Sequence, residues 1–237
     1  MLPKVSVGRH CCASSSNIDN YRSLVGDTLI DEILELSRDL RGVRICNINA
    51  TASGGGVAEL LSRQIPIYHA LGIAADWRII HGDKEFFTVT KGFHNALQGA
   101  EFDLTPAVID EYLEHNRQSA EALETDYDVY LVHDPQPAAV RHFVKHNSQK
   151  WIWRCHIDTS EPNRAVWEFL RPFVEAHDAA VFTMADFRPP DLQMERVFYI
   201  PPAIDPLSTK NMDLPLDICR RVIADAGVNL REPILLQ

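Results

Sequence analysis

Apolar and polar positions along this chain repeat with two different spacings. Short, nearly continuous apolar runs predict strands of a parallel sheet, which is covered on both faces. Six such runs occupy residues 43–49, 76–81, 128–133, 150–156, 179–183 and 196–200. Amphipathic stretches between them predict helices over residues 27–40, 56–71, 84–97, 106–123, 138–146, 163–176 and 216–226. This alternation with short loops predicts an α/β fold, a Rossmann-like doubly wound parallel sheet covered by helices.

Two predicted helices carry recognisable boundary signals. Thr105 followed by Pro106 is typical of a capping residue and the first position of a helix. Asp27 is placed to cap the helix 27–40, and Gly42 lies just past its end. That helix is expected to carry one apolar face, formed by Leu29, Ile33, Leu36 and Leu40.

The segment after the first strand holds three consecutive glycines. Ser53, Gly54, Gly55 and Gly56 lie between that strand and the next helix. Backbone N–H groups at a helix start that no side chain shields can bind a phosphate or a sugar hydroxyl. The spacing is not the G-x-G-x-x-G of dinucleotide-binding proteins. A tight turn without a ligand therefore remains an alternative for this segment taken alone.

Two further strand ends carry polar side chains suited to sugar binding, namely His133, Asp134, Arg154, His156 and Asp158. Ligands of doubly wound sheets bind beyond the carboxyl ends of the strands. Imidazole and carboxylate groups supply the acceptors and donors that sugar hydroxyls need. Asp134 and His156 are expected to face an open cleft. The alternatives are that the histidines are structural and that Asp134 and Asp158 cap the helices that follow.

A metal centre is a weaker interpretation of the same region. A hard nitrogen and oxygen site can be drawn from His81, Asp83, His133, Asp134, His156 and Asp158. Their spacing matches no known metal motif, so we predict neither a metal nor a cofactor. Mg²⁺ is compatible with the sequence without being required by it.

Composition excludes several classes of protein. The 237 residues carry a formal charge of −10, which disfavours a nucleic-acid partner. The polar first twenty residues do not look like a secretory signal, and no apolar run is long enough to cross a membrane. The five cysteines show no C-x-x-C pair and are expected to be reduced thiols of a cytoplasmic protein: Cys11, Cys12, Cys46, Cys155 and Cys219.

Four segments together carry a resemblance to a known family. They are GGGVAELL from Gly54, VHDPQ from Val132, WRCHIDTS from Trp153 and YIPPAIDP from Tyr199. From about residue 43 onward the chain resembles the amino-terminal half of retaining glycosyltransferases of the GT-B fold. The most similar subgroup is the glycosyltransferring trehalose synthases, with the trehalose phosphorylases as close relatives.

The resemblance implies a reaction and a set of site residues. The reaction is transfer of glucose, with retention, from a nucleoside-diphosphate glucose to glucose, forming trehalose. By position, Gly55 and Gly56 lie near the donor phosphates. Asp134 matches the acidic residue of the sugar site, and His156 matches the histidine near the transferring glucose, so these two are the expected catalytic residues. Ser53, Gly54, Arg154 and Asp158 complete the expected substrate-binding set.

The same resemblance implies a division of the chain. Residues 1–206 are expected to form the amino-terminal domain, and residues 207–237 a linker and the start of a second domain whose first strand begins at residue 233. Because a GT-B site lies between two domains, this chain is expected to hold one wall of it and to be inactive alone. The partners are then a nucleoside-diphosphate glucose and glucose or trehalose.

Other functions stay open on the sequence. A trehalose phosphorylase uses the same amino-terminal wall, and a non-catalytic sugar-binding or interaction module needs no second domain. An oxidoreductase is weaker because only Asp76, about twenty residues beyond the turn, fits a ribose-binding acid. Three tryptophans suit either a core or a subunit interface, which leaves a homo-oligomer open: Trp151, Trp153 and Trp167.

Overall fold

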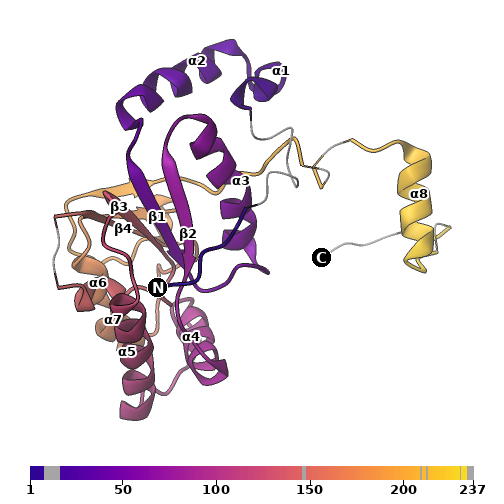
Figure 1. Ribbon diagram of the computed structural model, residues 1–237. Helices are drawn as coiled ribbons and strands as arrows, with labels where there is room; N and C mark the ends of the chain where they lie inside the picture. Colours follow the sequence, from indigo (N-terminus) through magenta and orange to yellow (C-terminus); the bar gives the residue numbers. More distant parts are fainter. Residues whose placement is uncertain (8–16, 146–147, 209, 212, 230, 234–237) are drawn as a thin grey trace. The chain divides into compact units, whose positions relative to one another are not determined.

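Six strands form one fully parallel sheet in the order β2-β1-β3-β4-β5-β6 (Figure 1). Their bounds are β1 Arg44–Asn49, β2 Ala74–Ile79, β3 Val129–His133, β4 Lys150–Arg154, β5 Ala179–Phe182 and β6 Val197–Tyr199. In register, Ile48 pairs with Val132, and His133 pairs with Arg154. The carboxyl ends of β1, β3 and β4 therefore lie next to one another. The doubly wound parallel sheet predicted from the sequence is confirmed.

The computed structural model describes residues 1–7, 17–145, 148–208, 210–211, 213–229 and 231–233. These residues divide into two compact units, residues 1–203 and residues 204–237. The first unit contains the whole sheet, and the second contains helix α8 (Leu216–Asp225). Cys11, Cys12 and residues 234–237 of the predicted last strand lie outside the described residues.

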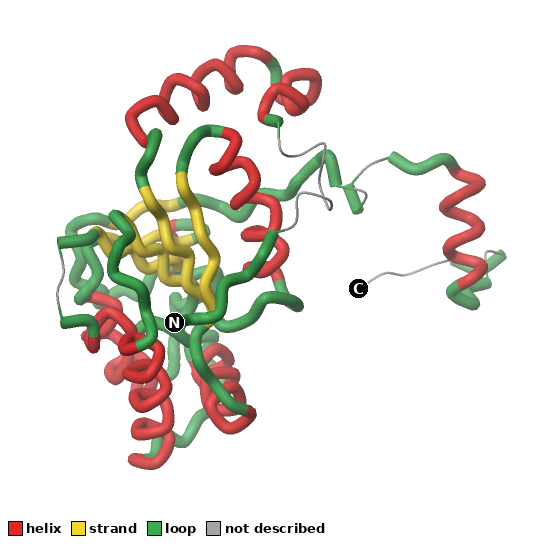
Figure 2. The backbone as a smooth tube through the Cα atoms, in the orientation of Figure 1, coloured by secondary structure: helices red, strands yellow, loops and turns green. Residues whose placement is uncertain are grey.

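Helices cover both faces of the sheet in the first unit (Figure 2). Helix α3 packs on one face through Ala58, Leu61 and Ile65, against Ala75 and Trp77 of β2. The other face is covered by α4 to α7. The bounds of these helices are α3 Gly56–Ala70, α4 Lys84–Ala96, α5 Pro106–Glu121, α6 Val140–Phe143 and α7 Arg164–Glu175.

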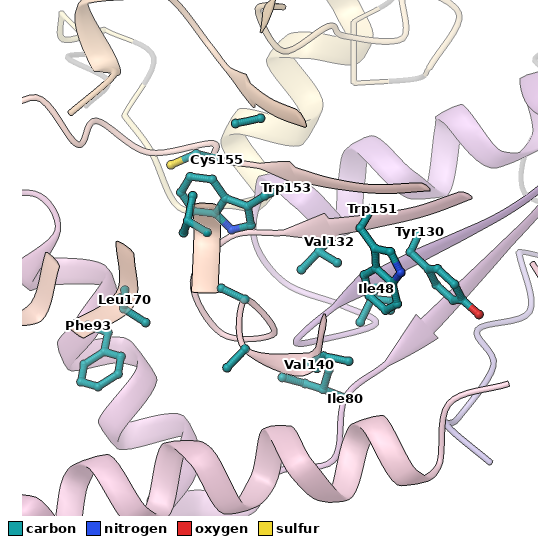
Figure 3. Packing of buried hydrophobic residues seen from close by; sticks show 14 of the residues in the cluster. Ile48, Ile80, Phe93, Tyr130, Val132, Val140, Trp151, Trp153, Cys155 and Leu170 are labelled. Atoms are coloured by element: carbon teal, nitrogen blue, oxygen red, sulfur yellow. The ribbon is translucent and has the colours of Figure 1, made fainter. Parts of the chain in front are cut away.

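The main core lies between the sheet and helices α4 to α7 (Figure 3). Trp151 and Trp153 of β4 are 0% and 1% exposed, and Trp151 stacks on Tyr130 with ring centroids 4.2 Å apart. Trp167 of α7 is also buried, and its indole N–H donates to Asp191. The three tryptophans are thus part of the core. Within the sheet, Cys46 and Ile48 face this core, while the intervening Asn47 lies on the opposite face, as the two-residue period of a strand requires.

The amino-terminal region departs from the prediction for residues 27–40. Helix α2 covers Asp27–Leu36 and continues as a 3-10 turn, Ser37–Leu40, while α1 covers Arg22–Val25 and follows the 3-10 turn Ile18–Tyr21. The cap is Gly26 rather than Asp27, whose carboxylate instead accepts a hydrogen bond from Arg22. Only Ile30 of α2 is buried. The apolar face of this region is largely exposed, because Leu29, Leu36 and Leu40 are 45%, 65% and 45% exposed.

Most other predicted elements agree with the structure to within two residues. The helix predicted over 138–146 is shorter, because the backbone is already extended at Val144, which leaves α6 as Val140–Phe143. Thr105 caps α5 by accepting a hydrogen bond from the Val108 N–H, with Pro106 as the first helical residue, as predicted. Among the described helices, none combines the length and apolar character needed to cross a membrane.

Candidate active site at the carboxyl ends of the strands

The sheet reverses its winding direction between β1 and β3. From β1 the chain crosses to β2 on one side, and it later returns to add β3 on the other side of β1. Such a switch point leaves a crevice beyond the carboxyl ends of the two strands, where ligands of this fold class bind. The predicted site residues follow β1, β3 and β4, so all three segments start from this edge of the sheet.

The glycine turn leaves the start of helix α3 uncovered. The backbone φ is 75° at Gly54 and 83° at Gly55, a region that favours glycine. Gly55 is the cap of α3, and within the described residues no side chain caps the first N–H groups of that helix. A β-carbon built at Gly54, Gly55 or Gly56 meets no atom of the described part of the chain within 4 Å. Exposed Ser53 precedes them and donates its N–H to Thr51 Oγ1 at 3.3 Å.

Asp134 couples the ends of β3 and β4. Its backbone N–H donates to the Arg154 carbonyl at 2.9 Å, and its Oδ1 accepts from the His156 N–H at 2.9 Å. Its own carbonyl accepts from the Trp153 indole N–H at 3.0 Å. The backbone is held at φ 64°, and among the described residues Asp134 is the one non-glycine position with positive φ. Backbone strain of this kind is often found at functional sites.

Asp134 does not face an open cleft, as the sequence led us to expect. Its residue is 8% exposed, because the end of β4 covers it. The carboxylate also does not cap the helix that follows, since its hydrogen bond goes to β4 and α6 has no side-chain cap. Burial raises the pKa of Asp134 to about 7, although the His156 N–H and the nearby Arg154 charge favour the carboxylate.

Arg154 is a buried cation at the same edge of the sheet. It is 8% exposed, and burial lowers the pKa of its guanidinium. Within the part of the chain that the structure describes, no carboxylate lies at ion-pair distance from it. A desolvated guanidinium without a paired anion is suited to attract an anionic group.

His133 and His156 stack in the same region. Their ring centroids are 5.3 Å apart with an interplanar angle of 16°, and His133 Nδ1 lies 3.0 Å from His156 Nε2. Burial holds the pKa of His133 well below its usual range, and burial together with the Arg154 charge lowers the pKa of His156 to about 4. Both imidazoles are therefore neutral near pH 7. His133 is a buried structural histidine, whereas His156 is half-buried.

Asp158 and the glycine turn stand apart from this group. The carboxylate of Asp158 accepts from the Ser160 N–H at 2.9 Å and so closes a turn. It does not cap α7, because Asn163 does so through the N–H groups of Ala165 and Val166. Among the described residues, the glycine turn makes no hydrogen bond to Asp134 or His156.

Sequence reasoning missed Asn47 of β1. This side chain is fully buried, and its Oδ1 lies 3.2 Å from His133 Nε2. Its Nδ2 donates to the Asp76 carbonyl of β2 at 3.3 Å. A signal was present, since Asn47 and Asn49 are polar at alternate positions of an otherwise apolar strand next to the glycine turn.

A separate cluster of two carboxylates and one histidine lies away from this edge of the sheet. Within the described residues, one group has the spacing of metal ligands, formed by Asp83, Glu111 and His115. His115 Nε2 lies 3.0 Å from Glu111 Oε1 on the same helix, and Asp83 caps α4 through the Phe86 N–H. Asp83 thus has a structural role as the cap of α4, and His115 pairs with Glu111 along α5. Of the residues considered for a metal centre from the sequence, only Asp83 belongs to this group.

Comparison with known proteins identifies relatives of this chain. A family model described as the trehalose synthase N-terminal domain matches residues 47–189. A trehalose synthase of Rubrobacter xylanophilus is 45% identical over 242 residues, which cover 100% of this chain and 57% of the relative. A trehalose synthase of Pyrococcus horikoshii is 42% identical over 222 residues, covering 93% and 53%. The chain thus spans slightly more than half the length of these relatives.

More distant comparisons extend the likeness. A trehalose phosphorylase of Grifola frondosa is 25% identical over 223 residues, covering 83% of this chain and 30% of that protein. A solved structure of trehalose-6-phosphate synthase gives a TM-score of 0.57 at 15% identity, covering 78% of this chain and 55% of the other. That likeness concerns the fold, which is the Rossmann-like amino-terminal domain of GT-B glycosyltransferases. The sequence matches go further, and the chain belongs to the trehalose synthase family, in which it corresponds to the amino-terminal domain.

Proposed function

We propose that this chain forms one wall of a retaining glycosyltransferase site that transfers glucose from a nucleoside-diphosphate glucose to glucose and produces trehalose. The observation that carries the proposal is the hydrogen-bonded unit of Asp134 and His156 at the ends of β3 and β4. It lies at the same edge of the sheet as the open glycine turn after β1. Sequence identities of 42% and 45% to proteins named trehalose synthase support the choice of reaction.

In the proposed reaction, positive charge develops at the anomeric carbon while the nucleoside diphosphate departs. The free N–H groups at the start of α3 stabilise the departing phosphate, because they and the helix dipole present partial positive charge. Arg154, which has no carboxylate at ion-pair distance among the described residues, adds positive charge at the same edge of the sheet. His156 and Asp134 hold hydroxyls of the transferring sugar, and Ser53 and Asp158 contact the substrate from the loops. The proposal requires neither a metal nor a cofactor.

We propose further that the rest of the site comes from the part of the relatives that this chain does not match. Half a site lacks the orientation and electrostatic stabilisation that dominate group transfer. The 237-residue chain is then inactive by itself. Its described cysteines are all unpaired, which supports a reducing compartment such as the cytoplasm: Cys46, Cys155 and Cys219.

The match to a trehalose phosphorylase supports one second candidate. Such an enzyme uses inorganic phosphate where the synthase uses a nucleotide, and the same glycine turn can bind either. The two reactions differ in the co-substrate that the complete enzyme requires. Trehalose breakdown that depends on inorganic phosphate, without any dependence on nucleoside diphosphate, would establish the phosphorylase.

The test uses the complete enzyme, with its amino-terminal domain carrying His156→Ala or Asp134→Asn. If both side chains hold the transferring sugar, kcat/KM for trehalose formation should fall at least about a hundredfold, equivalent to roughly 2.7 kcal/mol of transition-state stabilisation. The configuration of the product reports retention. Urea midpoints measured alongside separate lost function from lost fold. Near-normal kinetics in both variants would overturn the site assignment.

A further inference from the structure

A continuous line of polar groups runs through the sheet to His156. It begins at the backbone carbonyl of Asp76 in β2 and passes through the side chains of Asn47 in β1 and His133 in β3. The successive separations are 3.3 Å from Asn47 Nδ2 to the Asp76 carbonyl, 3.2 Å from Asn47 Oδ1 to His133 Nε2, and 3.0 Å from His133 Nδ1 to His156 Nε2. Asn47 and His133 are 0% and 1% exposed, so water does not compete for these contacts.

The donor and acceptor in each hydrogen bond of this line follow from the Asp76 carbonyl at its start. A backbone carbonyl only accepts, so the NH₂ group of Asn47 must face Asp76 and its oxygen must face His133. That oxygen also only accepts, so the proton of His133 is on Nε2 and donates to it. A neutral imidazole carries one proton, which leaves His133 Nδ1 bare. His156 Nε2 must therefore carry the proton that donates to His133 Nδ1.

We propose that Asn47 and His133 are positioning residues that fix the ring proton of His156 on Nε2 and leave its Nδ1 as an acceptor for a hydroxyl group. The identity of the hydroxyl, on a transferring sugar, rests on the proposed function, whereas the proton arrangement does not. A bare ring nitrogen binds a hydroxyl hydrogen and repels an anionic phosphate oxygen. The arrangement thus selects a hydroxyl over a phosphate at this point of the site.

The surrounding charges support two neutral rings. The Arg154 guanidinium disfavours a second positive charge on either imidazole, and both histidine pKa values are lowered. Asp134 bonds to the backbone N–H of His156 and leaves the ring to His133. The opposite proton order needs the Asn47 amide reversed, which would set two acceptor oxygens against each other at the Asp76 carbonyl.

Nitrogen NMR of the 237-residue chain with isotope-labelled histidine tests the proposal, because a protonated and a bare ring nitrogen have widely separated shifts. His177 is an internal reference for the opposite tautomer. Its Nδ1 lies 3.0 Å and 3.2 Å from the carbonyls of Phe173 and Val174, so its proton is on Nδ1. We expect His133 and His156 to show a protonated Nε2 and a bare Nδ1 near neutral pH. A protonated Nδ1 on His156 would overturn the proposal.

Two variants separate positioning from a merely structural role. His133→Phe keeps a stacked ring but removes the acceptor, and the His156 nitrogen shifts should move toward the average of two tautomers. His133→Gln provides an amide that can donate to Asn47 and accept from His156, so it should retain the wild-type shifts. Unchanged His177 resonances verify that each variant is folded. His156 shifts that stay at the wild-type positions in His133→Phe would refute the positioning role.

The measurement needs no sugar, so its failure is distinct from a failure of the proposed function. If the tautomer of His156 is as expected but His156→Ala leaves the kinetics of the complete enzyme unchanged, the proton arrangement stands and the sugar-binding role is wrong. If the tautomer is reversed while His156→Ala is inactive, the positioning proposal is wrong and the site assignment stands.

Discussion

At the scale of single residues, Asp134 combines two unfavourable features, a strained backbone and a buried carboxyl group. Its φ of 64° is one that aspartate tolerates better than most residues, and three hydrogen bonds to the end of β4 hold it there. Its carboxyl is buried beside Arg154 and His156, and its pKa is raised to about 7. Both features reduce stability, which is expected where geometry serves ligand binding.

The raised pKa of Asp134 predicts a pH-dependent effect of Asp134→Asn on stability. Between about pH 4 and pH 7 the folded chain keeps a proton on this carboxyl that the unfolded chain has lost, so stability falls as pH rises. Asparagine retains an acceptor for the His156 N–H and has no charge to bury. Across this window the variant should gain stability relative to wild type, by roughly 1.4 kcal/mol for each unit of pKa shift.

Urea unfolding at a series of pH values measures this difference. Histidines with lowered pKa values act in the opposite sense, because they make the folded protein less stable as pH falls below about 6.5. Both proteins contain these histidines. Subtracting the two curves therefore isolates Asp134. A difference that does not change with pH would contradict a raised pKa for this carboxyl.

The glycine turn offers a pair of variants that separates fold from function. Gly56 lies outside the left-handed region and has open space at its β-carbon position, so Gly56→Ala should leave the urea midpoint unchanged. If phosphate approaches this backbone, the added methyl group should raise KM for the nucleotide sugar in the complete enzyme at least about tenfold, equivalent to roughly 1.4 kcal/mol.

Gly55→Ala is the matched control for Gly56→Ala. Gly55 has a φ of 83° and a ψ of 162°, which an alanine adopts at a penalty of about 1–3 kcal/mol. This variant should lower both the urea midpoint and activity. Unaltered KM in Gly56→Ala would mean that no ligand approaches the turn at that position.

At the scale of elements, the start of α7 shows a polar residue with a structural role. Asn163 accepts hydrogen bonds from the N–H groups of Ala165 and Val166, and its own N–H donates to the Ala96 carbonyl. It lies only five residues beyond Asp158, just after the WRCHIDTS segment that carries part of the family resemblance. Proximity in sequence therefore does not make it part of the site.

Asn163→Ala should lower the free energy of unfolding by about 1 kcal/mol, because two N–H groups of α7 lose their acceptor. Asn163→Asp retains an acceptor and adds a negative charge at the helix start, so it should preserve stability. Urea unfolding of the chain measures both. A loss of kcat/KM in the complete enzyme that exceeds the loss of stability would show that Asn163 acts in the site after all.

At the scale of the whole molecule, the first unit contains a complete parallel sheet with helices on both faces and a buried core. We expect the 237-residue chain to unfold cooperatively in urea and yet to form no trehalose from UDP-glucose or ADP-glucose and glucose. Circular dichroism verifies the fold, and a sensitive trehalose assay measures the product. Clear turnover above the blank would show that one wall suffices.

Sugar binding by the 237-residue chain alone tests the non-catalytic alternative. Binding of glucose without any dependence on nucleotide, measured by calorimetry, would favour a sugar-binding module over one half of a transferase site. Absence of both binding and turnover agrees with a site that needs its second wall. The two assays together therefore distinguish the proposed function from its non-catalytic alternative.

The sequence by itself determined the elements of the fold and the edge of the sheet at which the candidate site residues lie. Strands buried on both faces appear as short apolar runs, and residues that follow them share one edge because the strands are parallel. Local patterns therefore predict the strands β1, β3 and β4. They also place the glycine turn, Asp134 and His156 at one edge of the sheet. The family motifs suggested the proposed reaction, which local chemistry does not specify.

Only the tertiary structure decided which polar residues are buried and how they are connected. Exposure depends on neighbours far away in the sequence, so the sequence did not show that the apolar face of α2 is largely exposed or that Asp134 is buried. The contact between Asn47 and His133 joins residues 86 positions apart, and it exists only because β1 and β3 are adjacent in the sheet. Packing of the whole sheet sets the strand order, and no local pattern fixes it. The position of the ring proton on His156 depends on the same strand order.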